Sequence, residues 1–202
     1  LRLVYLLLLL LAMAFTLPAS AQDKALSKKE IEALNKRAKT MVATQNVVAA
    51  IAIFEEIFAS TNDPKYLYNI GYLYQDSGQL DVAWDYYQRF LMEWPDAPNA
   101  EDLQTYLGEL AQTLKKSHVL THLFTEPAGA SVTILADDIT RKPSGVTPLS
   151  VWLPRGPVTL TFKRDGFEPL KKNWMVGDKR APRLKLALTP EPAGASLTLG
   201  AI

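Results

Sequence analysis

The spacing of hydrophobic positions changes once along the chain. Between residues 27 and 116, apolar side chains recur three or four positions apart, which is the period of amphipathic helices. From Val119 onward they alternate with polar residues in short runs, a pattern typical of strands that bury one face. The pattern predicts an α + β multidomain chain, in which an α-helical stack is followed by a small antiparallel β-sandwich.

Five helices are expected in the first half. The first begins at a capping box, where Ser27 and Glu30 satisfy each other's backbone N–H groups, and extends to about Val42. The second covers about residues 46–60, and the third and fourth lie on either side of Gly78, which suits a left-handed turn. After Pro95 has ended the fourth helix, the fifth extends from Ala100 to about Lys116.

A glycine lies in the middle of the third expected helix. Gly71 costs about 1 kcal/mol relative to alanine at such a position, so we expect a packing reason for it. Ala83 on the fourth helix is the candidate, because two residues without bulky side chains let helix backbones cross closely. The two helices are therefore expected to form an antiparallel pair.

These spacings resemble the signature of the tetratricopeptide repeat (TPR), a helical hairpin that here would occupy residues 64–97. The resemblance is carried by Leu67, Ile70, Gly71, Tyr74, Gly78, Ala83, Tyr87 and Pro95. It implies a scaffold, because each repeat leaves an apolar face that a neighbouring repeat must cover. We expect a helical domain over residues 22–117, with a degenerate repeat at about 27–63 and a sealing helix at 98–116.

Six strands are predicted in the second half. They cover residues 119–125, 130–135, 149–153, 158–163, 167–176 and 183–188, and turn signals containing Gly, Pro or Asp separate them. In the third to sixth of these runs, the side chains expected to face the core are Leu149, Val151, Leu153, Val158, Leu160, Phe162, Leu184, Leu186 and Leu188.

A second resemblance covers residues 118–189. Segments 127–132, 145–149, 153–156 and 166–169 resemble the PEGA domain, a β-rich module of bacterial envelope proteins, although Ala128 and Phe167 depart from its usual residues. The nine residues that begin at Glu126 recur in similar form 65 positions later, from Glu191. We therefore expect residues 190–202 to be the start of a second, truncated module.

The N-terminus resembles a secretory signal. Arg2 precedes an apolar run at residues 3–17, and the small residues before Gln22 suit a cleavage site, so residues 1–21 are expected to be a signal peptide. The alternative, a single-pass anchor, is disfavoured because a spanning helix needs roughly 20 apolar residues. We expect the mature chain to have no transmembrane segment and to reside in the periplasm, or outside, of a Gram-negative bacterium.

The composition excludes cysteine chemistry and separates the two halves of the chain by charge. The 202 residues include no cysteine, which excludes disulfides, thiolate metal sites and a lipidated cysteine. Residues 22–117 carry 10 basic and 14 acidic side chains, whereas residues 118–202 carry 11 and 7, which indicates two different domains.

Few residues suggest catalysis. His118 and His122 lie four positions apart, but the surrounding pattern is that of a strand, so we interpret them as linker histidines and not as metal ligands. Asp137 and Asp138 fit a polar hairpin tip better than a calcium site or an acid and base pair. No nucleophile triad, phosphate-binding loop or zinc motif occurs. We expect no enzyme activity, cofactor or metal.

Two binding functions remain, from different classes. The TPR resemblance implies a peptide groove, with Asn69, Tyr66 and Tyr72 as candidate contacts to a protein partner. The alternative is an anionic envelope polysaccharide bound by Lys163, Arg183 and Lys185, which are expected to face outward together on the sandwich. The first hypothesis makes the chain an exported adaptor whose PEGA-like module is a spacer or anchor. Nucleic acid is not expected as a partner of either half.

Overall fold

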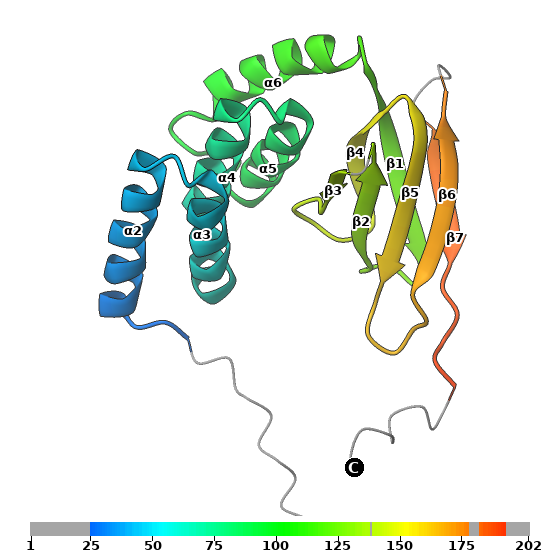
Figure 1. Cartoon of the computed structure of the whole chain (residues 1–202), viewed down its shortest axis with the longest axis horizontal. Coiled ribbons are helices and arrows are strands. Elements are labelled where there is room, and N and C mark those ends of the chain that lie inside the picture. The colour runs from blue at the N-terminus through cyan, green and yellow to red at the C-terminus, as the bar shows by residue number, and fades with distance from the viewer. Residues whose placement is uncertain (1–24, 138, 178–181, 193–202) are drawn as a thin grey trace, which may run out of the picture.

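The computed structural model describes residues 25–137, 139–177 and 182–192 (Figure 1). The expected signal peptide, Asp138 of the predicted hairpin tip and residues 193–202 of the predicted second module lie outside the described residues. Helices form one side of the molecule and two sheets form the other, which confirms an α + β chain. No helix within the described ranges is both long enough and apolar enough to cross a membrane.

The described residues form five helices, each close to its predicted range. They are α2 (Lys28–Ala43), α3 (Val47–Thr61), α4 (Lys65–Asp76), α5 (Leu80–Glu93) and α6 (Ala100–Leu114). The predicted capping box is present, because the Ser27 N–H donates to Glu30 Oε2 at 2.7 Å and Ser27 Oγ accepts from the Glu30 N–H. Gly78, with a φ of 77°, provides the left-handed turn between α4 and α5.

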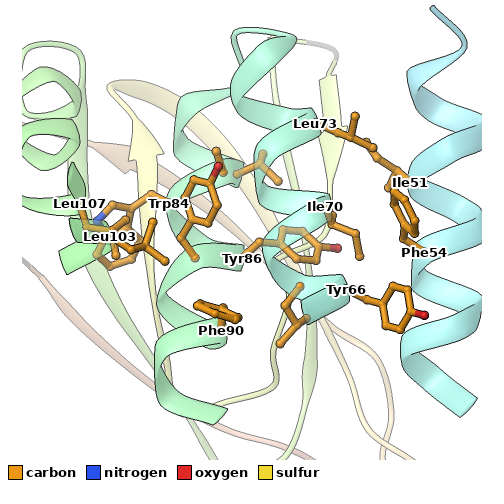
Figure 2. Packing of buried hydrophobic residues seen from close by; sticks show 14 of the residues in the cluster. Ile51, Phe54, Tyr66, Ile70, Leu73, Trp84, Tyr86, Phe90, Leu103 and Leu107 are labelled. Atoms are coloured by element: carbon orange, nitrogen blue, oxygen red, sulfur yellow. The ribbon is translucent and has the colours of Figure 1, made fainter. Parts of the chain in front are cut away.

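Aromatic residues contact one another between successive helices from α3 to α6. Each helix packs against the next one along the chain. Figure 2 shows Phe54 of α3 and Tyr66 of α4 directed toward one another, with ring centroids 5.9 Å apart. Tyr68 of α4 contacts both Tyr87 and Phe90 of α5. The helices contact mainly their sequence neighbours. Their buried side chains form one continuous apolar core.

The structure gives a different reason for Gly71 from the one predicted. A Cβ atom on Gly71 would lie 2.8 Å from both Cδ1 and Cε1 of Tyr87. Tyr87 is 2% exposed, so its ring has little room to move. The glycine therefore leaves space for an aromatic ring of α5, and the expected pairing with Ala83 is corrected to a pairing with Tyr87.

The remaining described residues form seven strands in two sheets. The strands are β1 (His118–Glu126), β2 (Ser131–Ala136), β3 (Ile139–Arg141), β4 (Leu149–Pro154), β5 (Gly156–Lys163), β6 (Leu170–Val176) and β7 (Arg183–Ala187). One sheet has the order β4-β1-β7 and the other has the order β3-β2-β5-β6. The three-residue strand β3 was not predicted. Because β7 pairs parallel with β1, the expectation of an entirely antiparallel sandwich is corrected.

The two sheets share a core. Leu123 and Val151 of the three-stranded sheet belong to the same buried cluster as Ile134 and Leu160 of the four-stranded sheet. All nine predicted core residues of the strands pack in or against this cluster, although Leu149, Leu184 and Leu186 are only half-buried. The inward positions of the strands were therefore predicted correctly from their alternation.

Candidate functional site

The helical candidate site lies on the surface of α4. Asn69 and Tyr72 are three residues apart, so their side chains lie on neighbouring turns of one face. Tyr72 is 52% exposed and Asn69 is half-buried. Among the described residues, the Asn69 side-chain amide has no hydrogen-bond partner. An amide beside an exposed phenol can donate a hydrogen bond to a carbonyl oxygen of a bound peptide and accept one from a peptide N–H.

The structure places Tyr66 elsewhere. Its ring is 2% exposed and packs on Phe54 of the preceding helix. Its hydroxyl accepts a hydrogen bond of 2.9 Å from Nδ2 of Asn35 on α2. Tyr66 therefore holds α2, α3 and α4 together and does not line an open surface, which corrects its assignment as a peptide contact.

Three further tyrosines gather beside Tyr72. The ring centroids of Tyr68 and Tyr87 are 5.4 Å apart, and those of Tyr87 and Tyr106 are 6.1 Å apart. Burial raises the pKa of Tyr87, and the neighbouring hydroxyls of Tyr68, Tyr106 and Tyr72 raise it further. We call Tyr68, Tyr72, Tyr87 and Tyr106 the tyrosine cluster. The cluster offers apolar ring surface together with polar hydroxyls.

No local sequence pattern groups these four tyrosines. Tyr68 lies on α4, Tyr87 on α5 and Tyr106 on α6, so only the packing of three helices brings them together. The sequence does show aromatic residues at helical spacing. Such residues more often belong to a helix core than to a binding surface, so the spacing alone did not point to this cluster. Tyr87 does belong to the core, whereas Tyr68 and Tyr106 are half-buried.

The basic candidate site is divided between the two sheets. Lys163 is exposed on β5 of the four-stranded sheet, whereas Arg183 and Lys185 are exposed on β7 of the three-stranded sheet. All three face away from the shared core, but the outer faces of two packed sheets point in opposite directions. The prediction that they face outward together is therefore corrected. Arg183 and Lys185 remain neighbours on one face.

The helices and sheets meet through two tryptophans. Trp84 of α5 and Trp152 of β4 lie edge to face, with ring centroids 6.0 Å apart. Trp152 occupies a position on the outer face of the sheet, since its partner across the strands is Leu120 and its neighbours Val151 and Leu153 face inward. It is nevertheless 2% exposed, because α5 covers it.

Polar contacts from the end of β3 and from the segment after it reinforce this junction. The Ser144 N–H donates to the carboxylate of Asp85, and its hydroxyl donates to the Asp85 carbonyl oxygen at 3.3 Å. Arg89 donates to the Ser144 carbonyl oxygen. Arg141 forms an ion pair of 3.1 Å with Asp81 and also donates to the Trp152 carbonyl oxygen.

Asp85 is an unusual residue for a buried position between a helix and a sheet. Burial raises its pKa from 3.8 to about 6, although the hydrogen bonds from Ser144 and the charges of Arg141 and Arg89 oppose this rise. A carboxyl group with this pKa is partly protonated in mildly acidic solution. Titration alone does not make Asp85 catalytic, because structural networks also shift pKa values.

A cleft of about 440 Å³ lies beside these contacts. Its lining combines apolar and polar side chains, and consists of Trp84, Asp85, Gln88, Arg89, Met92, Glu93, Leu120, Ser144, Gly145, Val146, Pro148, Leu149 and Ser150. Asp85 is bonded to Ser144, and Arg89 pairs with Glu93 at 2.8 Å. We call this hollow the junction cleft. The sequence did not predict it, because its two walls are far apart along the chain.

The two histidines do not share a site. His118 and His122 lie on the outer face of β1, where four residues span about 13 Å. Their Nδ1 atoms contact Ser117 Oγ at 2.8 Å and Ser150 Oγ at 2.7 Å, respectively. Burial lowers the pKa of His118, and the nearby carboxylate of Asp81 opposes this shift.

The acidic residues do not form a metal site with the histidines in the described part of the chain. No group of three or more His, Asp or Glu side chains there is arranged to hold a metal ion. Asp137, with a φ of 47°, is an exposed residue at the turn after β2. This position agrees with the interpretation of a hairpin tip.

Comparison with known proteins adds no further assignment. No model of a known protein family matches this chain, and no curated protein matches it. The resemblances noted in the sequence therefore rest on the residues that carry them and on the packing described above.

Proposed function

We propose that this chain is a non-catalytic exported scaffold that binds a protein partner through a TPR-like helical groove. In this proposal, residues 27–63 and 64–97 are two repeats, 98–116 seal the stack, and 118–189 form a separate PEGA-like domain. The second domain is an envelope-facing spacer or anchor. The protein would reside in the periplasm or outside of a Gram-negative bacterium, after removal of residues 1–21.

The packing of the helices supports the repeat interpretation. Each helix contacts the next, as expected for a stack of hairpins in which every unit covers its neighbour. Gly71 admits the ring of Tyr87, so two positions of the repeat signature act as one steric pair. The left-handed turn at Gly78 joins the two helices of the unit.

The observation that carries the binding function is the unpartnered amide of Asn69 beside the exposed ring of Tyr72. The Asn69 amide is half-exposed and has no partner within the described part of the chain, so it can exchange hydrogen bonds with water for hydrogen bonds with a peptide backbone. The adjacent tyrosine cluster adds ring surface to which an extended peptide can bind. These features favour a protein or peptide ligand for this surface.

The polysaccharide alternative lacks comparable support. It required Lys163, Arg183 and Lys185 on one surface, and these residues are divided between opposite faces of the packed sheets. We therefore retain the protein partner as the proposed ligand.

Site-specific photo-crosslinking in intact cells tests the proposal. A photoreactive residue at Tyr72 is expected to capture one defined protein, whereas the same residue at Met175, which is 66% exposed on β6, is expected not to capture it. Asn69→Ala should lower the yield at Tyr72 without changing the fold. Equal capture at both positions, or a yield unaffected by Asn69→Ala, would contradict the proposal.

A further inference from the structure

The outer face of the three-stranded sheet continues the junction cleft toward β7. The strand register places Trp152 beside Leu120, then Ser150 beside His122 and Arg183, then Phe124 beside Lys185. The face therefore changes from apolar at α5 to basic at the edge of the sheet. A second hollow lies at the basic end, and Pro148 lines both it and the junction cleft, so the two hollows are neighbours on this face.

We propose that this surface binds an extended segment of a protein partner that carries a bulky apolar side chain and, about four residues away, one or two carboxylates. The inference rests on the proposed function only in taking the partner to be a protein. It assigns a contact surface separate from Asn69 and Tyr72.

The lining of the junction cleft is the reason for expecting an apolar side chain in the ligand. Its rim includes Met92 and Val146, which are 80% and 52% exposed, and its floor includes Trp84 and Leu120. The charges that line it are already compensated, because Asp85 is bonded to Ser144 and Arg89 to Glu93. A cleft of this size that offers apolar surface and no free charge favours an uncharged, bulky side chain.

The basic residues at the edge of the sheet are the reason for expecting carboxylates in the ligand. Arg183 and Lys185 are exposed on the outer face of β7, and neither has an ion pair among the described residues. Glu126 is the one acidic side chain lining the second hollow, and it lies opposite Ala187 at the far end of the strands. Charged edge strands also discourage pairing between chains. The apolar cleft in line with these charges is the feature that points to a ligand.

The spacing follows from the register. Leu120 at the cleft and Phe124 beside Lys185 are four residues apart on β1, which corresponds to about 13 Å. An extended peptide covers that distance with about four residues. The surface therefore fits one continuous segment that crosses the face of the sheet.

A random peptide library displayed on phage, selected against the full chain, tests this inference. The selected peptides are expected to combine Leu, Phe, Met or Trp with Asp or Glu three to five positions away. Fluorescence anisotropy with one such synthetic peptide should show about tenfold weaker binding to Arg183→Glu/Lys185→Glu. A matched peptide with lysine in place of its carboxylates should bind this variant better than the native chain.

Three controls keep the outcome decisive. Lys163→Glu/Lys171→Glu, on the opposite sheet, should leave the affinity unchanged, whereas Met92→Lys should weaken it through the cleft rim. Tyr72→Ala should have no effect, so failure at this surface is distinguishable from failure of the helical groove. Selected peptides without carboxylates, or equal losses in the two double variants, would overturn the inference.

Discussion

Two glycines inside helices have opposite surroundings. Gly71 in α4 lies under the ring of Tyr87, whereas Gly108 in α6 is exposed, and a Cβ atom there would meet no atom within 4 Å beyond its chain neighbours and its own helix backbone. The same substitution at the two sites therefore separates the effect of helix propensity from the effect of packing.

We predict that Gly108→Ala raises the unfolding free energy by about 0.5 to 1 kcal/mol, because alanine is the better helix former. Gly71→Ala should lower it, because overpacking against Tyr87 costs about 1 to 3 kcal/mol and outweighs that gain. Gly71→Leu should unfold the helices. Urea titration followed by circular dichroism at 222 nm measures all three, and stabilisation by Gly71→Ala would show that the ring moves freely.

The buried carboxyl group of Asp85 predicts a pH dependence of stability. Its pKa is raised by burial to about 6 in the folded chain, so the folded chain binds a proton more readily than the unfolded chain. The unfolding free energy should therefore rise, by about 1 to 3 kcal/mol, as the pH falls from 7 to 4. Asp85→Asn should remove this contribution. His118 titrates in both proteins, so the difference between their pH profiles isolates Asp85, and parallel profiles would contradict the prediction.

Strand β4 has two buried faces. Val151 points into the core between the sheets, and Trp152 points into the helical core through its contact with Trp84. The indole N–H of Trp152 has no hydrogen-bond partner among the described residues. The strand thus joins two apolar clusters at the cost of one unpaired donor.

Substitutions of Trp152 should separate the contribution of its buried ring from that of its unpaired indole N–H. Trp152→Ala should destabilise the chain by about 3 to 5 kcal/mol, because it leaves a cavity beside Trp84. Trp152→Phe should cost much less, because it retains an aromatic ring and removes the unpaired N–H. Thermal denaturation followed by tryptophan fluorescence measures both. Similar losses for the two variants would mean that the indole nitrogen contributes to the junction.

The elements that could be predicted from the sequence are those specified by local periodicity. Five helices and six of the seven described strands have such signals, and the capping box even located the start of α2. Strand β3 was missed because three residues are too few to show an alternation. Tyr66 was misplaced because it is buried by contacts with two other helices, which the periodicity of its own helix does not report.

The same reasoning applies to the candidate site. Asn69 and Tyr72 were found from one helix alone, whereas the tyrosine cluster depends on the packing of α4, α5 and α6. The junction cleft requires α5 to meet the segment after β3, and no local pattern encodes that encounter. Lys163 was grouped with Arg183 and Lys185 because alternation gives the direction of a side chain but not the sheet to which its strand belongs.

On the scale of the whole molecule, a few side chains link the helices to the sheets. Arg141 is central, because it pairs with Asp81 on α5 and also bonds the backbone of β4. Both side chains of the pair are largely buried, with exposures of 12% and 16%. Removing one partner would leave the other charge poorly solvated.

A double-mutant cycle tests this link. Arg141→Met is expected to lower the unfolding free energy by about 1 to 3 kcal/mol and to increase amide exchange at residues 141–146. Asp81→Asn combined with Arg141→Met should recover part of the loss, because neither charge is then left alone. Strictly additive effects of the two substitutions would show that the ion pair does not couple the two parts.

The parallel pairing of β1 with β7 has a mechanical consequence. The helices precede the N-terminal end of β1, and the chain leaves the sheet at the C-terminal end of β7. Tension between these two points would pull the paired strands along their length, so the interstrand hydrogen bonds would be loaded together in shear instead of being opened one by one. Resistance to such tension depends on the rate of unfolding more than on equilibrium stability. The pairing thus suits a connector that must hold its length under load.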